Sequence, residues 1–291
     1  MTIKSVLVIG SGLMGSGIAQ VCAQSGIRVN LYDASGDALE KAVKNIAWSV
    51  GKFVEKGTLK EEKEVILNRI TRVSDLNAGA DVNLAIEAVF EKKELKQEIF
   101  KQLDLLCPPQ TLFATNTSAI PITELAAVTG RPEKFLGLHF FSPVPMMMAV
   151  EVIRGMMTSD ETAQTGKAFV QQIGKEPIAV NRDVAGFVIN RINFPATMEA
   201  MRLVEQGVAT VEDIDKGLRL ASGRRMGIFE TGDMVGLDVT YGALMAMYNE
   251  TGDPRWYPPL LLRRKVKAGH LGRKTGKGWY DYSEEKGKKK D

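Results

Sequence analysis

The amino-acid sequence predicts an α/β protein, in which a doubly wound, mostly parallel sheet precedes an all-helical C-terminal domain. From residue 1 to about 180, short β-branched runs alternate with helical patterns, which is typical of a parallel sheet covered by helices. The pattern changes after residues 181–183, and from Gly186 onward the residues favour helices. We therefore predict two domains, at residues 1–183 and 184–291.

Eight strands are expected in the first domain, each a short run of β-branched or apolar residues. They span residues 6–9, 28–31, 70–73, 82–86, 112–114, 135–138, 150–153 and 176–180. Helical patterns separate most of them. The clearest covers residues 92–106, where Leu95, Ile99, Leu103 and Leu106 recur on one face.

The second domain is expected to hold four helices and no strand. The helices are predicted at residues 187–205, 211–220, 230–249 and 254–268. An apolar stretch at residues 243–247 suggests that part of this domain is buried in a second subunit, so a homodimer is expected.

Composition excludes several classes of protein. No apolar run approaches the ~20 residues of a membrane span, and a net charge of +3 over 291 residues does not indicate a nucleic-acid partner. A modestly basic protein that binds an anionic ligand would have the same composition. Much of the charge lies in residues 286–290, which we interpret as a frayed terminus.

The cysteine content and the N-terminus favour a reducing compartment, and we expect the cytoplasm. Cys22 and Cys107 are the only cysteines and lack metal-ligand spacing, so neither a disulfide scaffold nor a metal site is expected. The start, MTIKSVLVIG, enters a predicted strand at once and shows no cleavable signal.

A glycine-rich turn follows the first strand and precedes a helix predicted at residues 16–24. Gly10 would permit the tight turn, Gly12 would let the backbone approach a pyrophosphate, and Gly15 would allow close packing of helix on strand. The backbone around Leu13 and Met14 would then present N–H groups to the phosphates. A flavodoxin-like turn without a dinucleotide is the alternative, but the βαβ context favours a Rossmann-like domain.

The second strand ends about twenty residues beyond the glycine turn, at Asp33. A carboxylate at this position accepts hydrogen bonds from the adenosine ribose hydroxyls and repels a 2′-phosphate. The sequence therefore predicts NAD rather than NADP as the cofactor.

Two histidines occur in the chain, and only one of them follows a predicted strand. His139 stands at the carboxyl end of an apolar strand, where ligands of open α/β sheets bind, whereas His270 lies in a glycine-flanked turn and is expected to face solvent. Glu151 follows twelve residues after His139 in another apolar strand. A buried carboxylate needs a partner, and pairing would orient the imidazole; a solvated glutamate on an edge strand is the alternative.

Two further polar residues are candidates whose roles the spacing leaves open. Ser118 follows the strand at residues 112–114, and Asn190 lies early in the first helix of the second domain. Asn190 could form an interhelical hydrogen bond or could contact a ligand.

Taken together, these residues resemble the 3-hydroxyacyl-CoA dehydrogenase family over essentially the whole chain. The His-Phe-Phe and Gly-Phe-x-x-Asn-Arg motifs, in this order and spacing, are specific to it. The resemblance extends through residues 10–20, 86–91, 116–118, 137–141, 186–191, 236–238 and 272–280.

The resemblance implies a role for each matched position. His139 would be the acid/base with Glu151 as its partner, and Ser118 and Asn190 would hydrogen-bond the substrate near the reacting oxygen. Further positions would contact the cofactor, namely Ala88, Glu91, Lys96, Asn116, Ser118 and Ser142. Ser142 replaces an asparagine that is common in the family. Lys52 and Lys56 match lysines near the phosphates of coenzyme A.

The reaction implied is reversible, NAD-dependent oxidation of an (S)-3-hydroxyacyl-CoA, with a short acyl chain and without a metal. One rival is the 3-hydroxyisobutyrate/6-phosphogluconate dehydrogenase group, but its Gly-x-x-Gly-x-Gly-x-x-x-Lys helix has no match here. The other is a non-catalytic, crystallin-like NAD-binding protein. Retention of Ser118, His139, Glu151 and Asn190 argues against that rival.

Overall fold

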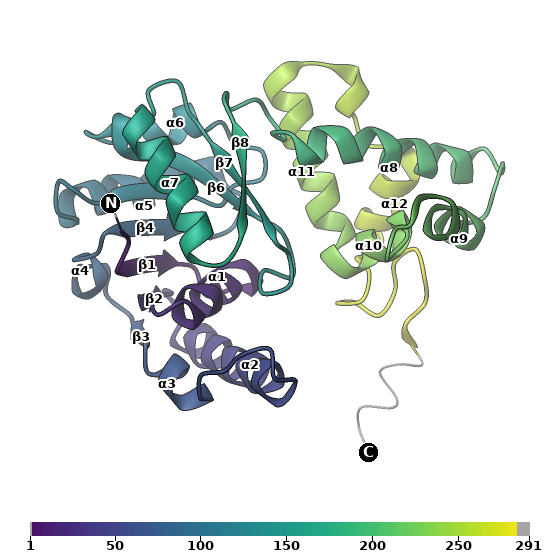
Figure 1. The fold of residues 1–291 in the computed structure, drawn as a ribbon. Helices are drawn as coiled ribbons and strands as arrows, with labels where there is room; N and C mark the ends of the chain where they lie inside the picture. Colours follow the sequence, from purple (N-terminus) through teal and green to yellow (C-terminus); the bar gives the residue numbers. More distant parts are fainter. Residues whose placement is uncertain (1, 284–291) are drawn as a thin grey trace. The chain divides into compact units, whose positions relative to one another are not determined.

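The computed structural model describes residues 2–283, apart from the side chains of residues 78 and 79. The basic segment at residues 286–290 lies outside the described residues. The chain divides into two units, Met1–Val184 and Ala185–Asp291, drawn from purple to teal and from green to yellow in Figure 1.

The first unit is built on one eight-stranded sheet with the order β3-β2-β1-β4-β5-β6-β7-β8. All neighbouring strands are parallel except β6 and β7, which are antiparallel. The predicted doubly wound, mostly parallel sheet is thereby confirmed. The strands are β1 (Ser5–Ile9), β2 (Arg28–Tyr32), β3 (Ile70–Val73), β4 (Leu84–Glu87), β5 (Leu112–Thr115), β6 (Phe135–Phe140), β7 (Ala149–Ile153) and β8 (Glu176–Val180).

Helices cover both faces of this sheet (Figure 1). On one face, Ile18 of α1, Ile46 of α2 and Phe169 of α7 share a core with the strands. On the other, Phe100 of α5 packs within 4.5 Å of the Phe135 ring, measured between centroids. The helical segments are α1 (Leu13–Gln24), α2 (Gly36–Glu55), α3 (Lys63–Leu67), α4 (Leu76–Gly79), α5 (Lys93–Leu106), α6 (Ile122–Ala126), the 3-10 turn η1 (Pro132–Lys134) and α7 (Asp160–Gln172).

The first helix begins earlier than the sequence predicts. It starts at Leu13 rather than Ser16, with Gly12 as its N-cap, so Gly15 lies inside its first turn. A Cβ atom on Gly15 would lie 1.8 Å from the carbonyl oxygen of Gly10. This glycine allows the helix to begin directly against the turn that precedes it.

The second unit is helical, as predicted, although two of the expected helices are each interrupted. Residues 230–249 form two helices rather than one, because Gly236 between them has a φ of 111°. Residues 254–268 are likewise split, because Pro258 and Pro259 precede the last helix. The elements are α8 (Ile189–Glu205), α9 (Val211–Ser222), α10 (Ile228–Val235), α11 (Leu237–Thr251), the 3-10 turn η2 (Pro254–Trp256) and α12 (Leu260–Lys267).

Two buried carboxylates fasten the segment that follows α12 to this helical unit. Asp233 accepts hydrogen bonds from the N–H groups of Trp279 and Tyr280, at 2.8 and 2.9 Å. Asp215 accepts one from the Tyr280 hydroxyl, at 2.9 Å. A Cβ atom on Gly278 would lie 2.0 Å from Asp233 Oδ1, so only glycine fits there.

The apolar stretch at residues 243–247 is largely used within the unit itself. Leu244 and Met247 are fully buried in its core, and the three other residues are half-buried. The stretch therefore gives less support to a dimer than the sequence suggested. Among the described residues, no helix combines the length and apolar character needed to cross a membrane.

Candidate active site

The glycine-rich turn lies where the strand order reverses, between the carboxyl ends of β1 and β4. Ligands of doubly wound sheets bind at such a switch point. A Cβ atom on Gly10, where φ is 99°, would lie 2.6 Å from the Ala88 carbonyl oxygen, so the two loops touch. Gly12 differs, because a Cβ atom there would meet nothing within 4 Å.

The open space at Gly12 is what a dinucleotide requires of this turn. The first N–H groups of α1, from Leu13 and Met14 onward, have no partner one turn earlier in the helix. Together with the helix dipole they favour a negatively charged group. The residues present therefore fit a pyrophosphate.

Asp33 braces this turn from the end of β2. Its carboxylate accepts hydrogen bonds from the Ser11 N–H at 2.8 Å, the Ser11 hydroxyl at 2.7 Å and the Ser35 N–H at 3.0 Å. Partial burial alone would raise the pKa of this carboxyl, but the hydrogen bonds outweigh burial and hold the pKa below its usual value. Asp33 is therefore ionised at neutral pH beside the turn.

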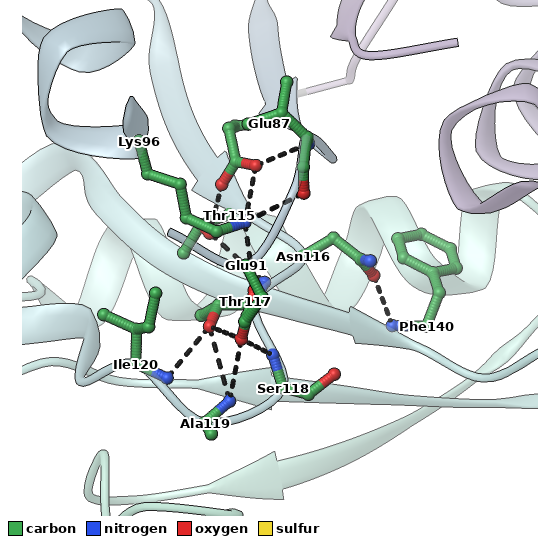
Figure 2. Close-up of polar contacts among 11 residues, drawn as sticks. Glu87, Glu91, Lys96, Thr115, Asn116, Thr117, Ser118, Ala119, Ile120 and Phe140 are labelled. Carbon is green, nitrogen blue, oxygen red and sulfur yellow. Dashed lines mark hydrogen bonds and ion pairs between the residues drawn. The ribbon is translucent and has the colours of Figure 1, made fainter. Parts of the chain in front are cut away.

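The turn after β5 carries two of the predicted site residues. Asn116 accepts a hydrogen bond from the N–H of Phe140, at 2.9 Å, and so joins this turn to β6 directly after His139. Ser118 is half-buried, and its N–H donates to Glu91 Oε1 at 2.8 Å. In Figure 2 the Ser118 hydroxyl points away from that carboxylate.

Beside this turn lies a cluster of charged groups, in which Glu87 and Lys96 are buried and Glu91 is exposed (Figure 2). The Lys96 ammonium is 2.6 Å from Glu87 Oε1 and 3.2 Å from Glu91 Oε2, and its side chain is 1% exposed. Burial would lower the pKa of Lys96, but the charges of Glu87 and Glu91 raise it above its usual value. Conversely, burial would raise the pKa of Glu91, but the Lys96 charge and hydrogen bonds from Thr117 and Ser118 lower it. Lys96 and Glu91 are therefore both ionised.

His139 and Glu151 meet across the one antiparallel strand pair. They are register partners in β6 and β7, and His139 Nδ1 lies 2.6 Å from Glu151 Oε2. The side chains are 6% and 0% exposed. β8 pairs with the outer edge of β7, so the alternative of a solvated glutamate on an edge strand is wrong.

The pair can hold a proton in a defined place. An ionised carboxylate only accepts hydrogen bonds, so the imidazole donates through Nδ1. The carboxylate thereby orients the ring and stabilises its protonated form. The Phe141 ring packs 4.7 Å from the imidazole, measured between centroids.

The connection between β6 and β7 includes Ser142, which is half-buried and forms a cis peptide with Pro143. Buried Lys175 holds this connection, because its ammonium donates to the carbonyls of Val144 and Met147, at 2.7 and 2.6 Å. The segment that leads from His139 to Glu151 is thus fixed from the start of β8.

Three of the predicted site residues lie away from this edge or in the other unit. Lys52 and Lys56 are exposed at the C-terminal end of α2, and Lys52 pairs with Glu55 at 2.7 Å. Asn190 is half-buried in the first turn of α8, in the helical unit. His270, which was expected to face solvent, is half-buried.

Sequence reasoning missed Glu87, Thr115 and Thr117, all of them completely buried. Glu87 has the feature that identified Glu151, since it is a lone carboxylate in the otherwise apolar strand Leu84–Glu87. The rule that a carboxylate in an apolar strand needs a buried partner was applied to the strand of Glu151. Applied also to the strand Leu84–Glu87, it would have identified Glu87.

The fold and the glycine turn at this edge define a class, the oxidoreductases with a dinucleotide-binding sheet. Family models define it further. The model of the 3-hydroxyacyl-CoA dehydrogenase NAD-binding domain matches residues 5–184, and that of the C-terminal domain of the same family matches residues 186–282. The chain belongs to the 3-hydroxyacyl-CoA dehydrogenase family and is an NAD-dependent oxidoreductase.

Individual relatives are similar over nearly the whole chain. A probable 3-hydroxybutyryl-CoA dehydrogenase of Bacillus subtilis is 43% identical over 285 residues, which is 98% of this chain and 99% of the relative. The crystal structure of (S)-3-hydroxybutyryl-CoA dehydrogenase from Ralstonia eutropha has a TM-score of 0.90 and 42% identity, covering 97% of this chain and 100% of that one. That of FadB2 from M. tuberculosis has a TM-score of 0.93 and 39% identity, with the same coverage.

Proposed function

We propose that the protein catalyses the reversible, NAD-dependent interconversion of a short-chain (S)-3-hydroxyacyl-CoA and the 3-oxoacyl-CoA. The names of the B. subtilis and R. eutropha relatives support 3-hydroxybutyryl-CoA as the substrate, and the R. eutropha name supports the (S) configuration. The observation that carries the proposal is the buried contact of 2.6 Å between His139 Nδ1 and Glu151 Oε2.

In the proposed mechanism His139 moves the proton. Bound NADH would supply a hydride to C3 of the 3-oxoacyl group. As charge develops on the C3 oxygen, His139 gives it the proton from Nε2, the ring nitrogen that does not face Glu151. In the reverse direction Nε2 takes the hydroxyl proton, and Glu151 stabilises the resulting imidazolium. General acid–base help of this kind contributes about 10²–10⁴-fold to the rate.

Two hydroxyl- or amide-bearing side chains would hold the C3 oxygen. Ser118 follows β5, and the neighbouring Asn116 is bonded to the N–H of Phe140, directly after His139. We assign Ser118 as a hydrogen-bond donor to the oxygen, and Asn190 as the second donor by its match to the family motif. Such donors act best when their positions are fixed before the reaction.

The cofactor site is proposed at the glycine turn. The pyrophosphate would lie at Gly12 and the start of α1, and Asp33 would accept hydrogen bonds from the adenosine ribose. The ionised Asp33 would repel a 2′-phosphate, so NAD is preferred to NADP. Ala88, Glu91, Lys96 and Ser142 are proposed to form the remainder of the cofactor site, together with Asn116 and Ser118.

The coenzyme A end, the assembly and the location of the protein are also proposals. Lys52 and Lys56 would attract the coenzyme A phosphates, and the protein would work as a homodimer. Burial raises the pKa of the Cys22 thiol to about 12 and that of Cys107 to about 11, so neither forms a reactive thiolate at neutral pH. This fits a cytoplasmic protein.

The experiment is an absorbance assay of NADH oxidation with acetoacetyl-CoA, repeated over a series of 3-oxoacyl chain lengths. The proposal predicts turnover that is fastest with short chains and an (S)-configured product. Absence of turnover with every 3-oxoacyl-CoA would refute it and favour a non-catalytic NAD-binding protein.

A further inference from the structure

Glu87 is a buried carboxylate that contacts three separate segments of the chain. Its Oε1 atom accepts hydrogen bonds from the Lys96 ammonium at 2.6 Å and from the Val89 N–H at 2.7 Å. Its Oε2 atom accepts one from the Thr115 hydroxyl at 2.7 Å. One fully buried side chain therefore ties the end of β4 to the loop that follows it, to α5 and to β5.

One of these contacts leads to the glycine turn. The Val89 N–H fixes the loop after β4, and the Ala88 N–H in the same loop donates to the Ile9 carbonyl at 2.7 Å. The Ala88 carbonyl is the group that leaves room only for glycine at position 10. Glu87 thus sets the backbone against which the glycine turn packs.

The other contacts lead to Ser118 by two routes. Along the first, the Thr115 hydroxyl that donates to Glu87 also accepts from the Thr117 N–H, at 3.2 Å. Along the second, Lys96 joins Glu87 to Glu91. Both routes end on the turn after β5 (Figure 2).

Glu91 Oε1 accepts three hydrogen bonds from the turn after β5. They are the Thr117 hydroxyl at 2.5 Å, the Ser118 N–H at 2.8 Å and the Ala119 N–H at 3.2 Å. The Thr117 hydroxyl in turn accepts from the Ile120 N–H at 2.9 Å. Every N–H from Thr117 to Ile120 therefore has an acceptor within the network.

The charges make the network rigid rather than adaptable. One ammonium lies between two carboxylates, and removing it would leave the completely buried Glu87 carboxylate without its counter-charge. Because the Lys96 side chain is 1% exposed, its ammonium serves these carboxylates from inside the protein.

We propose that Glu87 is a positioning residue that, through Thr115 and the Lys96–Glu91 pair, holds Ser118 in register with the glycine turn. The proposal rests on the function proposed above, because Ser118 is placed there as a donor to the reacting oxygen. Glu87 itself touches neither substrate nor cofactor. Its effect on the reaction passes through the backbone of residues 115–119.

The network can be weakened without removing a buried charge. Thr115→Val keeps the shape of the side chain and deletes the hydroxyl, whereas Thr115→Ser keeps the hydroxyl. We expect Thr115→Val to lower kcat with acetoacetyl-CoA by about tenfold, since a buried donor and acceptor both lose their partner, and Thr115→Ser to restore most of the loss. With Ser118→Ala already present, Thr115→Val should cost less than about twofold, because residues that act as a unit are non-additive.

Hydrogen exchange gives a readout that needs no substrate. In Thr115→Val and Glu87→Gln, the amides of residues 117–120 should exchange at least about tenfold faster, while those of β1 and β2 stay unchanged. Asp104→Asn is the matched control, because Asp104 on the same helix α5 fixes another turn by accepting from the Gly130 N–H at 2.6 Å. It should leave both kcat and exchange at residues 117–120 unaltered.

Two results would overturn the positioning role. The first is unchanged exchange at residues 117–120 in Thr115→Val and Glu87→Gln, whether or not the wild-type protein reduces acetoacetyl-CoA. The second is a loss of kcat on Thr115→Val that is equally large with and without Ser118. A wild-type protein that reduces no 3-oxoacyl-CoA would refute the proposed function alone, since exchange still decides the positioning role.

Discussion

Replacing Glu151 by glutamine keeps the size of the side chain and removes its charge from the pair with His139. The two side chains are register partners 2.6 Å apart, and both are buried, so water cannot take over the role of the carboxylate. A protonated imidazole would then be left in the protein without its counter-charge. Breaking a buried pair in this way costs about 3–5 kcal/mol.

The free-energy cost of breaking the His139–Glu151 pair can be converted into an expected change in kcat. At about 1.36 kcal/mol for each tenfold change, Glu151→Gln should lower kcat by about 10²–10⁴-fold. Steady-state NADH oxidation with saturating acetoacetyl-CoA measures this loss. NADH affinity, measured by fluorescence titration, should change less than about threefold, because neither residue lies at the glycine turn, the proposed site of the pyrophosphate.

The paired substitutions test whether the two residues act together. His139→Gln should be about as damaging as Glu151→Gln, and the double variant little worse than either. The rate of reduction by the wild-type protein should also fall as pH rises, because the protonated imidazole is the proposed proton donor. Near-normal kcat in Glu151→Gln, or fully additive losses in the double variant, would refute the reasoning.

Three sites outside the pair, and the assembly of the protein, give further predictions. Asp33→Ala should narrow the preference for NADH over NADPH. Better use of NADPH than of NADH by the wild-type protein would contradict this role of Asp33. In the wild-type protein, NADH affinity should hold as pH falls from neutral to 3.8 and decline only at lower pH, because the pKa of Asp33 is lowered from 3.8 and the ionised form is lost only as pH drops through the lowered value. Asp233→Asn should lower the free energy of unfolding by about 1–3 kcal/mol in denaturant titrations, since Asp233 is buried and accepts hydrogen bonds from two backbone N–H groups. An unchanged denaturation midpoint would show that these hydrogen bonds make no net contribution to stability. Lys52→Ala with Lys56→Ala should raise KM for acetoacetyl-CoA several-fold at low salt and leave kcat unchanged; an unaltered KM would remove both lysines from the coenzyme A site. Sedimentation should give a dimer, and a monomer at micromolar concentration would exclude the proposed assembly.

Much of the fold followed from local patterns. All eight strands lie where β-branched runs predict them, because each run is short and is bounded by turn residues. The breaks in the helical unit were harder to predict. Gly236 reads in the sequence as one tolerated glycine within a helix, and only its φ of 111° shows that it separates α10 from α11.

The candidate site was predictable only where a residue type stands out against its strand. His139 and Glu151 are polar residues in apolar strands. Their pairing was inferred because a buried carboxylate requires a polar or charged partner. Their register could not be read from the sequence, because it depends on β7 turning back antiparallel to β6. The contacts of Glu87 were hidden for the same reason, since they join β4, β5 and α5 through tertiary packing.

The most direct test of the account compares wild-type protein with His139→Gln in one assay, the rate of NADH oxidation with acetoacetyl-CoA at neutral pH. The account predicts steady turnover by the wild-type protein and a loss of at least about 10²-fold in the variant, with NADH binding retained in both. Wild-type protein that leaves NADH unoxidised, or a variant that keeps the wild-type rate, would contradict it.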